Sequence, residues 1–77
     1  MKKTNKYLSY NLLWKLLIDK GFSKQKLREL SGLSSASIAK LAKGQNVNTD
    51  VLLSICDALE CQLSDIVEIK EIKKDIR

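Results

Sequence analysis

The stretch KQKLRELSGLSSASIAKLAKG, residues 24–44, contains two short helical patterns that are separated by a single glycine. The first pattern covers 24–31 and the second covers 35–43, with a turn at 32–34 between them. Gly32 allows a tight turn that a side chain would strain, and serine is a favoured residue at the start of a helix. The spacing therefore predicts a helix-turn-helix.

The outer face of the second helix indicates what this unit contacts. Ile38 and Leu41 recur at helical spacing and are expected to face inward. The outward positions are then small or basic, namely Ser35, Ala36, Ala39, Lys40 and Lys43. A helix that enters the major groove of DNA needs short side chains near base edges and a few hydrogen-bond donors. An ordinary solvated helix is the plain alternative, but it would more often carry Glu–Lys pairs, and 35–43 has no acid.

Charge is distributed unevenly along the 77 residues, whose net charge is +5. Residues 20–45 carry a net +5, whereas residues 46–68 carry a net −5. Such asymmetry predicts an electrostatic footprint for a polyanion on one side of the molecule, although a basic segment can also be a simple solvated face.

Helix starts follow one recurring pattern: an apolar residue, then Ser or Asn, then an apolar residue five positions after the first. Serine and asparagine are preferred N-caps, and the apolar pair acts as a hydrophobic staple. The four matches are Leu8-Ser9…Leu13, Phe22-Ser23…Leu27, Leu33-Ser34…Ile38 and Val47-Asn48…Leu52. Glycines fall where three of the helices should end. The expected helices cover 10–20, 24–31, 35–43 and 49–59.

A fifth start at Ser64-Asp65 has a cap but lacks the staple, because Glu68 occupies the second apolar position. The tail that follows is ambiguous. Three of its isoleucines share a helical face, while Val67 and Ile69 alternate as in a strand. Helix propensity favours a helical tail. It could pack back onto its own domain or associate with a second copy.

These patterns predict an all-α fold, a compact bundle of about five short helices. We expect one domain over 1–77, with a core at about 10–69 and a tail of uncertain structure at 70–77. Trp14 and Phe22 are expected to pack in the core.

Several classes of function lack the residues they need. The sequence has no histidine, and Cys56 and Cys61 alone cannot complete a tetrahedral zinc site. We interpret them as small core residues and expect no metal and no cofactor. There is no phosphate-cradling glycine loop and no nucleophile with a neighbouring base, so we expect no enzyme.

A membrane location is also not expected. No apolar run approaches the roughly 18 residues that a membrane span requires. Lys15 and Asp19 interrupt the apolar stretch near the N-terminus, which argues against a secretory signal. The protein is expected to be cytoplasmic, and direct binding of a small-molecule ligand is not expected.

Residues 10–69 resemble the Cro/C1-type (XRE-family) helix-turn-helix domain, and in particular its small bacterial transcriptional regulators. The matching segments are YNLLWKLLIDKGFSKQKLRELSGLSSASIAKLAKG and VNTDVLLSICDALECQLSDIVEI. The resemblance implies a lambda-repressor-like bundle of about five helices in which the third is the recognition helix. It also implies a homodimer that binds an inverted repeat in double-stranded DNA.

Residue roles follow from the matched positions. Ser35, Ala36, Ala39 and Lys40 correspond to base-facing positions in the family. Lys24 corresponds to a phosphate contact, and Lys43, Gln45 and Asn46 correspond to the helix end and loop that lie along the DNA backbone. Lys26 is added to this phosphate-binding set because of its charge.

Two residues depart from the family pattern. Position 28 is usually small, because the two motif helices cross closely there, so Arg28 must extend outward or accompany a wider crossing. Ser31 is more polar than the common apolar choice.

A different class of function stays open beside DNA binding. The chain could be a protein-interaction module, such as an antitoxin or adaptor, that uses its acidic region 46–68 or its C-terminal tail, because fold does not fix function.

Overall fold

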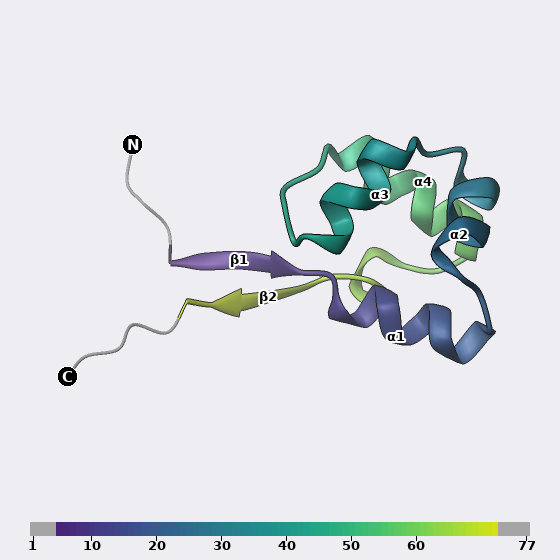
Figure 1. Cartoon of the computed structure of the whole chain (residues 1–77). Helices are drawn as coiled ribbons and strands as arrows, with labels where there is room; N and C mark the ends of the chain where they lie inside the picture. The colour runs from purple at the N-terminus through teal and green to yellow at the C-terminus, as the bar shows by residue number, and fades with distance from the viewer. Residues whose placement is uncertain (1–4, 73–77) are drawn as a thin grey trace.

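Four helices and a two-stranded sheet make up the structure, a computed structural model that describes residues 5–72. The helices are α1 (Asn11–Lys20), α2 (Lys24–Ser31), α3 (Ser35–Ala42) and α4 (Thr49–Leu59), followed by the single 3-10 turn η1 (Leu63–Asp65). The strands are β1 (Lys6–Ser9) and β2 (Glu68–Glu71). The helices form a body, and the paired strands extend away from it as a ribbon (Figure 1).

The prediction of an all-α fold is wrong because both ends of the domain form strands. β1 and β2 are antiparallel, with Leu8 opposite Ile69 and Ser9 opposite Glu68. Helix propensity favoured a helical tail, but pairing with β1 satisfies the backbone of 68–71 and brings Ile69 against Leu8, so tertiary pairing overrides propensity. The remainder of the predicted tail, 73–77, lies outside the described residues.

The predicted fifth helix is also wrong. Only η1 forms there, and its N-cap is Gln62 rather than Ser64. The Gln62 N–H donates to Asp65 Oδ2 at 2.9 Å, which holds the turn closed without adding helical residues. The chain then passes through the fully buried Ile66 into β2.

The first helix starts one residue later than predicted. Ser9 belongs to β1 and is 7% exposed, and Tyr10 takes the N-cap position of α1. The Ser9 Oγ still accepts a hydrogen bond from the Asn11 N–H, at 3.3 Å. α2 and α4 have the predicted bounds, and α3 ends one residue earlier than predicted, at Ala42.

Helix ends follow the predicted glycines. Gly21, Gly32 and Gly44 have φ values of 72°, 74° and 73°, in the left-handed region that glycine adopts without strain. α4 ends without a glycine, at the predicted residue Leu59, and Glu60 adopts the same left-handed region with φ 53°.

The core lies between the helices and under η1. Its fully buried large side chains are Leu13, Leu27, Leu41, Ile55 and Ile66. Trp14, Phe22, Cys56 and Cys61 are partly buried and pack against this core, as predicted. Leucine and isoleucine side chains from every helix therefore hold the helix-turn-helix in place. In the described part of the chain, no helix is long and apolar enough to cross a membrane.

Leu27→Ala is expected to destabilise the domain by about 2–5 kcal/mol, because Leu27 is 0% exposed and its loss leaves a cavity under α2. Urea denaturation followed by circular dichroism measures the change. Leu30→Ala is the matched control on the same helix, since Leu30 is 44% exposed and should cost far less. Equal losses for the two variants would contradict this packing.

Candidate nucleic-acid interface

α2 and α3 each begin after a serine whose hydroxyl caps the first turn of the helix. Ser23 Oγ accepts the Lys26 N–H at 3.0 Å, and Ser34 Oγ accepts the Ser37 N–H at 3.1 Å. These bonds satisfy amides that a helix start would otherwise leave unpaired. The Gly32 N–H closes α2 by donating to the Arg28 carbonyl at 2.9 Å.

Two hydrogen bonds explain why Ser31 is polar where the family usually has an apolar residue. Its hydroxyl donates to the Leu27 carbonyl at 2.7 Å and accepts the Leu33 N–H at 3.4 Å. A single polar side chain thus joins the last turn of α2 to the turn that follows. Arg28 is exposed, in keeping with outward extension, the first of the two alternatives that the sequence left open.

The outer face of α3, which we define as Ser35, Ala36, Ala39, Lys40 and the C-cap residue Lys43, is exposed throughout. Ile38 and Leu41 hold the opposite face at 8% and 1% exposure. At 100° per residue, Ala36, Lys40 and Lys43 then lie near the centre of the exposed side. The helix consequently presents short side chains flanked by two ammonium groups.

The loop after α3 has an anchor that the sequence did not reveal. Tyr10, from the start of α1, is 4% exposed, and its Oη donates to the Gln45 carbonyl at 2.9 Å. The Gln45 N–H in turn donates to the Lys40 carbonyl at 2.9 Å. Two hydrogen bonds therefore fix the backbone of a residue in the predicted phosphate-binding loop. Burial also raises the pKa of the Tyr10 phenol.

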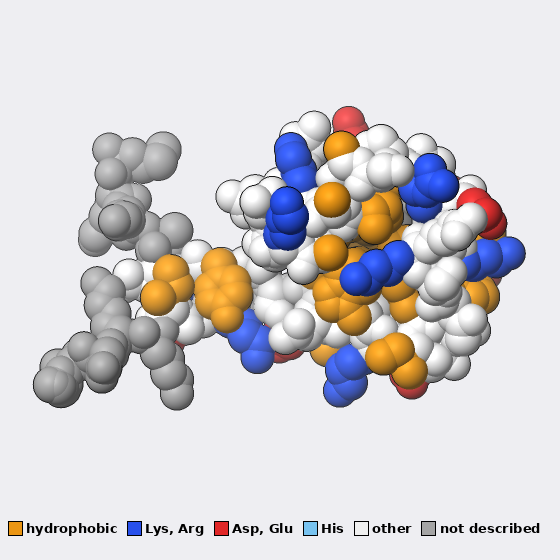
Figure 2. Space-filling model, in the orientation of Figure 1, with side chains coloured by type: hydrophobic (Ala, Val, Ile, Leu, Met, Phe, Trp, Pro, Cys, Tyr) orange, Lys and Arg blue, Asp and Glu red, His pale blue; other side chains and the backbone are white. Residues whose placement is uncertain are grey.

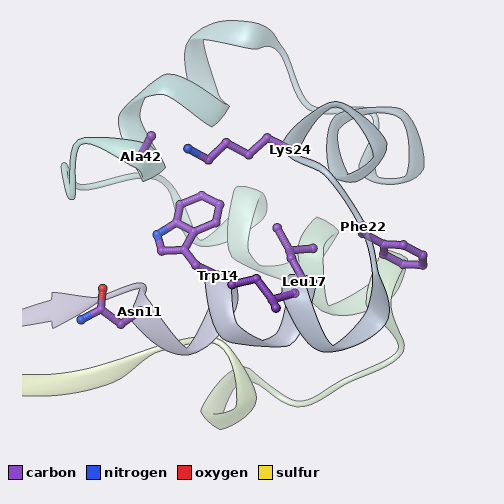
Figure 3. A pocket seen from close by; sticks show the side chains of 7 residues that line it. Asn11, Trp14, Leu17, Phe22, Lys24 and Ala42 are labelled. Carbon is purple, nitrogen blue, oxygen red and sulfur yellow. The ribbon is translucent and has the colours of Figure 1, made fainter.

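Lys24 is held over an aromatic ring at the start of α2. Its Nζ lies 5.0 Å from the ring centroid of Trp14, a cation–π geometry. Figure 3 shows the Lys24 side chain crossing above Trp14 toward Ala42 at the end of α3. The hollow between them is also lined by Asn11. Trp14, expected only to pack in the core, also positions this ammonium.

Two of the predicted phosphate-binding residues, Lys24 and Lys43, line adjacent hollows. Asn11, Trp14 and Ala42 line both the hollow with Lys24 and a neighbouring hollow with Lys43, so the two lysines border one continuous surface. Asn11 was not among the predicted site residues, because a polar residue in the first turn of a helix gives no distinctive sequence signal.

Two other predicted residues lie outside these two hollows. Lys26 lies two positions after Lys24 on α2, and side chains two apart do not share a helix face. Asn46 lines a hollow with Tyr7, Leu8 and Ile69 at the ribbon.

The positive charges of this face are not balanced by ion pairs with carboxylates in the described part of the chain. Lys24, Lys26, Lys40 and Lys43 form no ion pair within residues 5–72. Basic side chains lie across the face of the helical body that carries α3, and acidic ones lie at its rim (Figure 2). A surface of free ammonium groups attracts a polyanion.

The two cysteines lie away from this surface. Burial, together with the neighbouring Cys56, raises the pKa of the Cys61 thiol to about 11. Among residues 5–72 no three histidine, cysteine or acidic side chains gather as metal ligands would.

Raising the pH above 9 is expected to lower the free energy of unfolding. The folded pKa of Cys61 lies above its ordinary value of 9.0, so the neutral thiol stabilises the fold below pH 9, and this contribution is lost as the pH rises toward 11. Thermal denaturation of Cys61→Ala against the parent protein between pH 8 and 11 measures the effect. The parent should lose more stability than the variant, and identical pH profiles would contradict the burial argument.

The fold and the site together define a helix-turn-helix domain, and residues 12–71 match the family described as the Cro/C1-type HTH DNA-binding domain. The chain belongs to this family. It is also similar to a solved structure, the crystal structure of the transcriptional regulator VanUg (Form II), with 45% sequence identity and a TM-score of 0.86. That similarity covers 92% of this chain and 95% of the VanUg chain. None of the curated proteins matches the chain significantly.

Proposed function

We propose that the protein is a small transcriptional regulator that binds double-stranded DNA in a sequence-dependent manner. α3 would enter the major groove through its outer face. The observation that carries this proposal is the exposure of Ser35, Ala36, Ala39 and Lys40 on one side of a helix whose other side is buried. Membership of a DNA-binding family and the similarity to a transcriptional regulator support it.

Phosphate contacts and base contacts would be made by different residues. Lys24, Lys43, Gln45 and Asn46, with Lys26 beside them, would bind the DNA backbone and set the register. Asn11 joins this proposed set, since it lines both the hollow with Lys24 and the hollow with Lys43. Lys40 and Ser35 would read bases, with each good contact contributing about 1–3 kcal/mol of discrimination.

We further propose that two copies act together on an inverted repeat. Few donors face the groove, so one α3 would read only a short half-site with modest selectivity. Two copies related by twofold symmetry would read half-sites about 10 bp apart.

Lys40→Ala is expected to relax base preference more than Lys24→Ala, because Lys40 would contact a base and Lys24 a phosphate. A competition assay over operator variants measures both. Lys24→Ala should weaken binding to all operator variants by a similar factor. Lys40→Ala should reduce the difference in affinity between the preferred operator and the mutated operators. Uniform losses for both variants would contradict the assignment of Lys40.

The alternative is an antitoxin or adaptor that binds a protein partner through 46–68 or the tail. Salt-sensitive binding to duplex DNA by the protein alone favours the regulator. Binding only to a partner protein, with no duplex binding, favours the adaptor.

A further inference from the structure

α4 ends in a backbone motif that brings two cysteines together. The Cys61 N–H donates to the Cys56 carbonyl at 3.0 Å. The Glu60 N–H donates to the Asp57 carbonyl at 3.4 Å, and Glu60 itself has the left-handed φ of 53°. These two bonds around a left-handed residue form a Schellman motif, in which the side chains of the first and last residues frequently contact each other. Cys56 and Cys61 occupy those two positions.

The end of α1 shows which side chains the same motif pairs elsewhere in this chain. The Phe22 N–H donates to the Leu17 carbonyl at 2.9 Å. The Gly21 N–H donates to the Ile18 carbonyl at 3.0 Å and completes the motif. Leu17 and Phe22 line one hollow, with Leu17 in the core and Phe22 packed against it. The end of α4 therefore has two thiols where the end of α1 has an apolar pair.

We propose that Cys56 and Cys61 form a reversible redox pair, a modification site that closes an intramolecular disulfide by exchange with a small-molecule disulfide. The bond would join the last turn of α4 to the segment that leads into η1. This inference does not depend on the proposed DNA binding.

The backbone places the two cysteines within bridging distance. An N···O distance of 3.0 Å, combined with standard bond lengths, limits the two Cα atoms to a separation of at most about 7 Å. Disulfides join cysteines whose Cα atoms are about 4.4–6.8 Å apart. Both thiols are free and only partly buried. The pair can therefore be bridged without unwinding α4.

A small oxidant can reach the pair from the surface. Cys61 lines a hollow with Lys20 and Asp65. Burial and the neighbouring Cys56 raise the pKa of the Cys61 thiol to about 11, so its thiolate is scarce near neutral pH and exchange is expected to be slow. In reducing compartments the disulfides that form are usually transient. The pair would accordingly respond to an oxidant and return to the dithiol afterwards.

The exchange takes place in two steps that transfer two electrons. One protein thiolate attacks a sulfur of the small-molecule disulfide, which forms a mixed disulfide and releases one small thiolate. The second protein thiolate then attacks the protein sulfur of the mixed disulfide, which closes the Cys56–Cys61 bond and releases the second small thiolate. The two protons from the protein thiols end on the two released molecules. An excess of small thiol reverses both steps.

Incubation of the folded full chain with oxidised glutathione tests the pair. After denaturation and alkylation with N-ethylmaleimide, the intact mass should show a single chain that has lost two hydrogens and carries no maleimide. Cys56→Ser and Cys61→Ser are the matched variants, and each should stop at a mixed disulfide with one glutathione. A parent chain that carries two glutathiones, that forms disulfides between chains or that keeps both thiols free would overturn the proposal.

Equilibration in mixtures of reduced and oxidised glutathione tests whether the fold brings the thiols together. The effective concentration of one thiol at the other should be at least about fivefold higher in the folded chain than in concentrated urea, and the oxidised protein should unfold at a temperature about 5 °C higher or more. Glu60→Val should lower the effective concentration because a β-branched residue opposes the left-handed conformation, whereas Glu60→Gly should not. Equal effective concentrations in the folded and unfolded chain, or a lower unfolding temperature after oxidation, would overturn the proposal.

Discussion

Ala39→Glu is expected to weaken binding to duplex DNA by at least about 100-fold while leaving the fold intact. Ala39 is exposed on the outer face of α3, so a glutamate there disturbs no packing. In the proposed complex the new side chain would hold the helix backbone away from base edges. It would also place a carboxylate among phosphates, and such like-charge contacts cost several kcal/mol.

Titration of labelled duplex DNA, followed by fluorescence anisotropy, measures this loss. Leu53→Glu is the matched control, because Leu53 is a 61% exposed residue on α4 and the variant has the same net charge. The control should bind DNA nearly as well as the parent, and both variants should unfold at temperatures close to that of the parent. Undiminished binding by Ala39→Glu would show that the outer face of α3 does not approach the duplex.

Salt is expected to have the second large effect. If about four phosphates are neutralised by each copy, the slope of log affinity against log salt approaches about −7 for a dimer, so affinity falls by about 10⁴-fold between 50 and 200 mM salt. The uncompensated lysines of this face are the source of that dependence.

Two lysine variants test whether the surface that Lys24 and Lys43 border causes the salt dependence. Lys43→Ala should make the slope shallower by about 2 for a dimer, since it removes one phosphate contact from each copy. Lys15→Ala should leave the slope unchanged, because Lys15 lies in a hollow with Asp19 and Leu59, apart from the hollows that Lys24 and Lys43 line. Equal slopes for all three proteins would contradict the phosphate assignments.

The central helices could be predicted from the sequence because their signals are local. Ser23 and Ser34 cap the helices that follow them, and Gly32 and Gly44 adopt the left-handed conformation after α2 and α3. Each of these features depends on residues within one helical turn. The bounds of the helix-turn-helix were therefore predicted to within one residue, together with the exposed side of its second helix.

The ribbon could not be predicted because its partners are about 60 residues apart. β2 has the helix-favouring residues Glu68, Lys70 and Glu71, and only the presence of β1 beside them makes a strand favourable. The same reason applies to the site: Tyr10 reaches the Gln45 carbonyl, and Trp14 lies under Lys24 from another helix. Contacts between distant segments leave no periodic signal in the residues that make them.

Selection of bound sites from random duplex DNA, at low and at physiological salt, tests most directly whether α3 reads base sequence. We predict an enriched motif with twofold symmetry and half-sites about 10 bp apart, bound far more weakly at the higher salt concentration. Recovery of no common sequence at either salt concentration would contradict sequence readout by the outer face of α3.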